Sequence, residues 1–430
     1  MDDDRLGGLF DGTSRNATLA WSITVVLCVL AAGHALDGSY RWFAFTCVAL
    51  AVVVAPAVAF RDPRVMPPSE LLLVIAVPVV DATVFGRSFL TAIAVYVAVA
   101  AVALVVAVEI HRFTPARMNH VFAVGLVVIA TLAVAATWNV AQWASDAALG
   151  TSYIVGGRSQ DAANHGMMVD FAYALVAGLL AGVVFDRYFR LQPGSNGAGR
   201  ATARSETPIP APPPEERTPA PSLVRDRLDV PESYVRTLSR AMQIALGGIL
   251  LYGLVTHDPT MIVNAGLALG ITFLPAVLEH DSRLPLEPEL ALWLTTAVFL
   301  HSLGSAGLYD LVGPWDTLTH TLSATIVAAA GYAVVRAIDL HTDEIYLPPK
   351  LLFVFILLFV LAFGVVWELG EFALDLSAQR FGIEAVLSQH GIDDTIVDLV
   401  FDFVGAVVVA AWGSVYLTDV SHRIADRFGR

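Results

Sequence analysis

The chain has 430 residues, 56% of them hydrophobic, and a formal net charge of −14. A mean hydropathy of +0.67 excludes an ordinary soluble protein of this size, and the acidic balance argues against a nucleic-acid-binding protein, which needs a basic surface. The composition predicts an all-α, polytopic membrane protein that sits in the lipid bilayer of the cell membrane.

The apolar stretches predict about twelve membrane-spanning helices, because each comes near the roughly 20 residues that cross a hydrocarbon core of about 30 Å. The first stretch follows an acidic leader without a basic segment, so we expect it to remain as a helix and not to be cleaved as a signal peptide. The spans are expected at approximately residues 18–35, 42–60, 70–86, 90–110, 118–142, 166–187, 236–256, 259–278, 288–308, 317–338, 350–371 and 395–417.

Similar segments recur in the two halves of the chain in the same order. For example, TWNVAQWASD at residues 137–146 resembles VWELGEFALD at residues 366–375. We therefore predict two six-helix repeats, residues 18–190 and 234–418. Six is an even number of spans, so the two repeats should be parallel in the membrane.

The two repeats differ in charge at matching positions. Where the second repeat has Glu368 and Glu371, the first has the neutral amides Asn139 and Gln142. The first repeat therefore keeps the sequence pattern without the ionisable groups. We expect a polar site in the second repeat and a degenerate copy of it in the first.

The segment between the repeats, residues 191–233, is rich in Pro, Gly, Ala and Ser. Such a composition cannot bury an apolar core, so we expect a disordered linker. Polar tails are expected at residues 1–17 and 419–430.

The distribution of basic residues predicts the orientation of the chain. With a cytoplasmic N-terminus, only Arg41, Arg87, Arg158 and Arg380 of the 25 basic residues fall outside. This asymmetry agrees with the positive-inside rule. It places both termini and the linker in the cytoplasm.

Three segments of the second repeat carry ionisable side chains three or four residues apart, so that each set shares one helix face. The pairs are Asp316 with His320, Glu368 with Glu371, and Asp398 with Asp402. In the expected orientation, these side chains lie near the extracytoplasmic ends of their spans. We therefore expect them to converge at one level of the bilayer.

These faces contain no Lys or Arg, although crowded carboxylates cannot all stay ionised without a cation. Either a metal ion or protons must complete the site. Oxygen ligands with one imidazole favour Mg²⁺, Mn²⁺ or Zn²⁺. The predicted metal ligands are His320, Glu371, Asp398 and Asp402, with Glu368 and Asp316 in catalytic roles.

The same motifs resemble the YjdF-like family of uncharacterised bacterial inner-membrane proteins, over about residues 270–415. That family pairs a D-x3-H helix, a WE-x2-E helix and a DT-x2-D helix, which match segments beginning at Asp316, Trp367 and Asp394. More distantly, the D-x3-D-x2-G pattern that ends at Gly405 is similar to VanZ-like membrane proteins. The resemblance implies the fold and the site, and it implies no reaction.

The sequence leaves three functions open. The first is a metal-dependent hydrolase or transferase that acts on a lipid or lipid-linked substrate, with Glu368 as general base. The second is a proton- or cation-coupled transporter, and the third is a structural membrane protein with a vestigial site. A transport pathway needs polar groups across the whole membrane, whereas the cytoplasmic half of the presumed pathway is nearly uncharged. This distribution favours the enzyme.

Overall fold

The computed structural model describes residues 14–86, 89–191, 231–282, 288–342, 344–382, 389 and 391–416. The described chain is helical apart from turns, connections and one isolated bridge between Arg117 and Tyr346. The expected tails at residues 1–17 and 419–430 and the expected linker at residues 191–233 lie almost wholly outside the described residues.

The helices agree with the expected spans in number and order. In the first half they are α1 (Ser14–Leu36), α2 (Tyr40–Phe60), α3 (Ser69–Val84), α4 (Phe89–Phe113), α5 (His120–Leu149) and α6 (Gln160–Leu191). In the second half they are α8 (Glu232–Thr256), α9 (Pro259–Thr272), α10 (Leu274–Ser282), α11 (Pro288–Leu303), η2 (Gly304–Leu308), α12 (Tyr309–Leu311), α13 (Trp315–His341), α14 (Pro349–Phe381) and α15 (Ile392–Tyr416).

Within the described residues, ten helical segments are long and apolar enough to cross a membrane. Two expected spans are not among them. Helix α3 has only 16 residues, and α15 carries four aspartates between residues 393 and 402. The chain is an all-α polytopic membrane protein, in which α3 is apolar but short and α15 is long but carries several charges.

Several helices differ in extent from the expected spans: α5 ends seven residues later, at Leu149, and α6 begins six residues earlier, at Gln160. The expected span at 259–278 is split into α9 and α10, because Pro275 has no backbone N–H to continue the hydrogen-bond ladder. Helix α14 continues ten residues beyond the expected end at Glu371, as far as Phe381. It stops where Gly382 adopts a left-handed φ of 65°.

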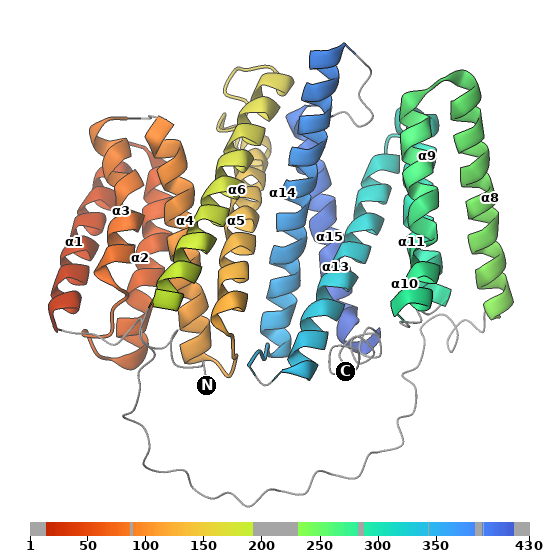
Figure 1. Ribbon diagram of the computed structural model, residues 1–430. Coiled ribbons are helices and arrows are strands. Elements are labelled where there is room, and N and C mark those ends of the chain that lie inside the picture. The colour runs from red at the N-terminus through yellow and green to blue at the C-terminus, as the bar shows by residue number, and fades with distance from the viewer. Residues whose placement is uncertain are drawn as a thin grey trace, which may run out of the picture.

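The helices form a broad row in which α1 and α8 lie at opposite edges, and α14, α15 and α13 lie in the middle (Figure 1). Helix α14 packs against both α5 and α15, while α13 packs along α15. The largest buried apolar cluster joins α5 and α6 of the first half to α14 and α15 of the second, with Phe171 and Val365 fully buried. The two halves therefore share one core.

Helices α13 and α15 approach each other closely at Gly405. A Cβ atom at this position would lie 2.5 Å from the backbone oxygen of Thr321 and 2.9 Å from Cβ of Ala324. Small residues allow this kind of close backbone contact between membrane helices. The contact fixes the separation of the two helices that carry most of the ionisable residues.

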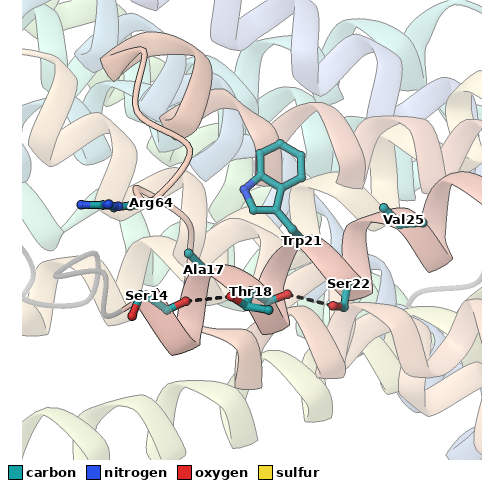
Figure 2. Close-up of a pocket in the computed structure, with 7 residues that line it drawn as sticks. All are labelled: Ser14, Ala17, Thr18, Trp21, Ser22, Val25 and Arg64. Carbon is teal, nitrogen blue, oxygen red and sulfur yellow. Dashed lines mark hydrogen bonds between the residues drawn. The ribbon is translucent and has the colours of Figure 1, made fainter.

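One open pocket lies at the beginning of α1, far from this contact in the row of helices (Figures 1 and 2). Its polar lining includes Thr18 and Ser22, whose hydroxyls donate to backbone oxygens of α1. Arg64 is its one charged lining residue. No carboxylate or imidazole lines this pocket, so it is separate from the predicted site residues.

Candidate functional site

The candidate site begins at the first turn of α13. Asp316 stands in that turn, where the positive end of the helix dipole favours a carboxylate, and His320 follows one turn later on the same face. Helix α15 brings Asp398 and Asp402 to this face by packing along α13. The arrangement follows directly from the four-residue spacing in both helices.

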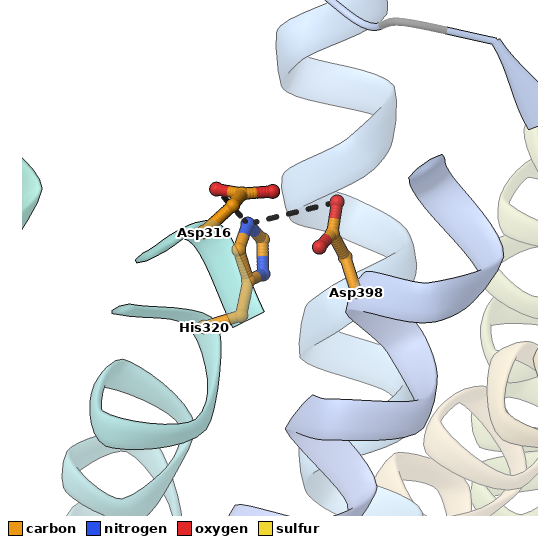
Figure 3. A group of neighbouring side chains, drawn as sticks. All are labelled: Asp316, His320 and Asp398. Atoms are coloured by element: carbon orange, nitrogen blue, oxygen red, sulfur yellow. Dashed lines mark ion pairs between the residues drawn. The ribbon is translucent and has the colours of Figure 1, made fainter. Parts of the chain in front are cut away.

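One nitrogen of His320 faces two carboxylates. Its Nε2 atom lies 3.9 Å from Oδ1 of Asp316 and 3.8 Å from Oδ2 of Asp398. Figure 3 shows the imidazole of His320 between the two carboxylates, with Asp316 on the same helix as His320 and Asp398 on α15. The three side chains each offer one ligand atom, and these atoms all lie within 4.8 Å of one another.

The other nitrogen of His320 is held by a third carboxylate. Its Nδ1 atom lies 3.5 Å from Oδ1 of Asp402, which is only 9% exposed. Gly364 on α14 makes room for this carboxylate, because a Cβ there would lie 2.9 Å from Oδ2 of Asp402. An acceptor at Nδ1 keeps the proton on that nitrogen and leaves Nε2 free to bind an ion.

Glu368 is the most buried acid of the site, at 1% exposure. Its Oε2 atom accepts a hydrogen bond of 2.8 Å from the side-chain amide of Gln389, and its Oε1 atom is buried without a hydrogen-bond partner in the described part of the chain. Glu368 interacts electrostatically with Asp398, Asp402 and His320. It therefore belongs to the same group without being part of the ligand triad.

Glu371 lies one turn after Glu368 on α14, and its side chain is more exposed than that of Glu368. Its Oε1 atom accepts a hydrogen bond of 3.0 Å from the indole N–H of Trp367. It interacts electrostatically with His320, Asp316 and Asp394. The structure therefore brings all six predicted site residues into one region. Among the three closest ligand atoms it places Asp316, and not the predicted ligands Glu371 and Asp402.

A hydrogen-bonded pair beside Asp316 was not predicted from the sequence. The Tyr309 hydroxyl lies 2.7 Å from Nδ1 of His301 and 3.3 Å from Oγ1 of Thr319. Burial raises the pKa of this hydroxyl above its usual value, so the group stays protonated and can donate a hydrogen bond. Tyr309 and His301 extend the polar region toward α11.

The backbone between α11 and α12 explains why the Tyr309 side chain lies beside His301. The π-helical turn η2 precedes Tyr309, and the tyrosine ring packs where a side chain at Gly304 would otherwise lie. Gly307 has a φ of 121°, which side chains rarely allow. Such π-turns occur frequently at functional sites. The glycines in GSAGL were the one sequence signal for this irregular turn.

Comparison with known proteins finds a family match in the half of the chain that carries the site. Residues 238–419 match the family described as predicted membrane protein (DUF2238). The match covers most of the second half of the chain. It contains every predicted site residue, which confirms the resemblance to a family of uncharacterised membrane proteins, while the similarity to VanZ-like proteins stays a prediction.

Other matches cover shorter parts of the chain. Residues 4–66 match a domain of unknown function (DUF8268). An uncharacterised protein of Thermotoga maritima is 29% identical over 140 residues, which are 32% of this chain and 68% of that protein. No solved structure matches the chain significantly. That the first half of the chain repeats the second half stays a prediction.

Proposed function

We propose that Asp316, His320 and Asp398 bind a divalent metal ion. Two ligand atoms that are each about 2.1 Å from one ion can lie at most about 4.2 Å apart. The distances of 3.8 and 3.9 Å from His320 Nε2 to the two carboxylates fall within that limit. The third pair, between Asp316 and Asp398, is within 4.8 Å, so the two carboxylates must move closer together to share one ion.

The surrounding acids suit supporting roles. Asp402, on the far side of the imidazole, orients His320 in the way that carboxylates orient metal-binding histidines. Glu371 is close enough to interact with His320 and can serve as a further ligand. Carboxylate oxygens with one imidazole are compatible with Zn²⁺, Mn²⁺ or Mg²⁺, with the imidazole favouring the first two.

We infer from this site a membrane-embedded hydrolase or transferase that acts on a lipid or lipid-linked substrate. A divalent ion in such a position makes a bound water nucleophilic near neutral pH. Glu368 supplies a carboxylate oxygen without a described hydrogen-bond partner, which suits a general base. The observation that carries the proposal is the placement of three ligand atoms within 4.8 Å of one another at the start of two membrane helices.

The metal content of detergent-purified protein tests this proposal. We expect about one Zn²⁺ or Mn²⁺ per chain, and we expect the Asp402→Asn variant to bind it 10- to 100-fold more weakly, as is typical when the partner of a metal-binding histidine is lost. The measurement is isothermal titration of metal-stripped protein. Asp375→Asn, which changes a half-buried acid on α14 that accepts a hydrogen bond from Gln379 of the same helix, is the matched control and should bind metal as the wild type does.

Two outcomes would count against the enzyme. Wild-type protein that neither contains nor binds a divalent ion removes the metal centre. Protein that binds no metal but carries protons or cations across reconstituted vesicles, with the flux lost in Asp398→Asn, would identify a transporter instead.

We also propose that the site faces the extracytoplasmic side and that both termini lie in the cytoplasm. The support is the excess of basic residues in the segments assigned to the cytoplasm. A fluorescent protein fused after Arg430 should fluoresce, whereas alkaline phosphatase at the same point should be inactive because its disulfides do not form in the cytoplasm. Phosphatase fused after Gly382 should be active. The reverse pattern would invert the proposed orientation.

A further inference from the structure

The first half of the chain reaches the acids of the second half through a side-chain relay. Asn164 on α6 donates a hydrogen bond of 2.8 Å from Nδ2 to Oε1 of Gln389. The Nε2 atom of Gln389 then donates to Oε2 of Glu368 at 2.8 Å and to the backbone oxygen of Glu368 at 2.9 Å. Both amides therefore donate in the direction of Glu368, and Gln389 accepts from Asn164, whose own Oδ1 atom has no hydrogen-bond partner among the described residues.

Asn164 can therefore influence the position of Glu368 through Gln389, without contacting Glu368 itself. Gln389 can present its amide N–H₂ to Glu368 in only one of its two flipped orientations. The backbone oxygen of Glu368 can only accept, so it requires the Gln389 N–H₂ on that side. The hydrogen bond from Nδ2 of Asn164 then holds the oxygen end of Gln389 in place. Asn164 is itself 5% exposed, so water cannot easily take its place.

A second set of contacts fixes the beginning of α15 against the first half. The carboxylate of Asp393 accepts hydrogen bonds of 2.7 Å from Trp143 on α5 and 2.8 Å from Gln160 on α6. Gly391 has a φ of 94°, and a Cβ there would lie 2.9 Å from Cβ of Gln160. The chain on both sides of Asp393 is thus placed by helices of the first half.

We propose that the first half is the positioning scaffold of the site, with Asn164 acting through Gln389 to fix the Glu368 carboxyl group. Asn164 is a positioning residue and does not contact the metal ligands. This role explains why a half without the ionisable residues stays packed against the half that has them. The inference deepens the proposed function, because Glu368 is its general base, but the relay can be measured without any metal.

Infrared spectroscopy of the full-length protein provides the test. The difference between wild type and Glu368→Gln identifies the carboxyl band of Glu368. We expect Asn164→Leu, which keeps the side-chain volume but removes the donor, to shift that band. Asn139→Leu is the matched control, since Asn139 is also a buried amide of the first half but donates only to Ala135 of its own helix. It should leave the band unchanged.

Thermal unfolding of the same variants provides a second readout. Asn164→Leu should lower the Tm by a few degrees in the wild-type background and by much less in Gln389→Ala, because the two residues act through one hydrogen bond. If Asn164→Leu does not fold, Asn164→Ser replaces it, since serine keeps a small polar group there.

The outcomes separate this inference from the proposed function. A Glu368 band that stays in place in folded Asn164→Leu, or that moves equally in Asn139→Leu, overturns the positioning role even if the protein binds metal. A wild type that binds no metal overturns the metal centre, while a band shift specific to Asn164→Leu would still establish the relay.

Discussion

Replacing His320 by alanine should abolish metal binding by the purified protein. His320 supplies the one nitrogen that faces both Asp316 and Asp398, so its loss removes a ligand and leaves only carboxylates. The affinity should therefore fall by more than the roughly 10- to 100-fold that the loss of an orienting partner costs. Metal analysis after gel filtration, together with titration of the metal-stripped variant, measures this directly.

A second substitution at the same position separates ligation from charge. His320 is the basic side chain that pairs with Asp316, Asp398 and Asp402 within the described residues. His320→Arg places a permanent positive charge among these acids but offers no metal ligand. We expect it to be more stable than His320→Ala and equally free of metal. If His320→Arg retains the bound ion, the imidazole is not a ligand.

A buried histidine elsewhere provides the control for these variants. His34 on α1 is 6% exposed and contacts Thr83. Helix α1 lies at one edge of the row of helices, whereas α13 lies in the middle (Figure 1). His34→Ala removes a buried imidazole without touching the acids of the site. It should therefore keep the wild-type metal content. Loss of metal in this variant would show that general destabilisation, and not ligation, explains the effect at His320.

Helical periodicity accounts for what the sequence could predict of this site. Asp316 with His320, and Asp398 with Asp402, are four residues apart in helices that the apolar pattern already located, so each pair had to share a face. The position of these residues near the extracytoplasmic ends of their spans then predicted that they would meet, and the lack of basic residues predicted a metal ion or protons among them. No comparable rule predicts which carboxylate faces which nitrogen of His320, because that depends on the relative rotation of α13 and α15.

The contacts that sequence reasoning missed are irregular or distant in the chain. Tyr309 follows a π-helical turn, which has no periodic signal. Asn164 and Gln389 are 225 residues apart, so only the packing of α6 against α14 and α15 brings them together. Asn164 also looked unremarkable in sequence, as one amide in a helix of the half that lacks ionisable site residues.

The packing of α13 against α15 leads to the other large expected effect. Gly405→Ala should destabilise the protein by up to about 2 kcal/mol, although alanine favours a helix over glycine by about 1 kcal/mol. The added Cβ would lie 2.5 Å from the backbone oxygen of Thr321 and 2.9 Å from Cβ of Ala324. Neither neighbour can move without moving α13, so the overpacking cost of about 1–3 kcal/mol exceeds the gain in helix propensity.

A glycine-to-alanine change at an open position on α14 should instead stabilise the protein. Gly370 is exposed and has no atom within 4 Å of an added Cβ, so Gly370→Ala gains helix propensity without a clash. Thermal unfolding in one detergent compares the two variants. Separating α13 from α15 also moves His320 away from Asp398, so Gly405→Ala should bind metal more weakly while Gly370→Ala does not. Equal or greater stability of Gly405→Ala would mean that the helices can part without cost, and the site would then not depend on their close contact.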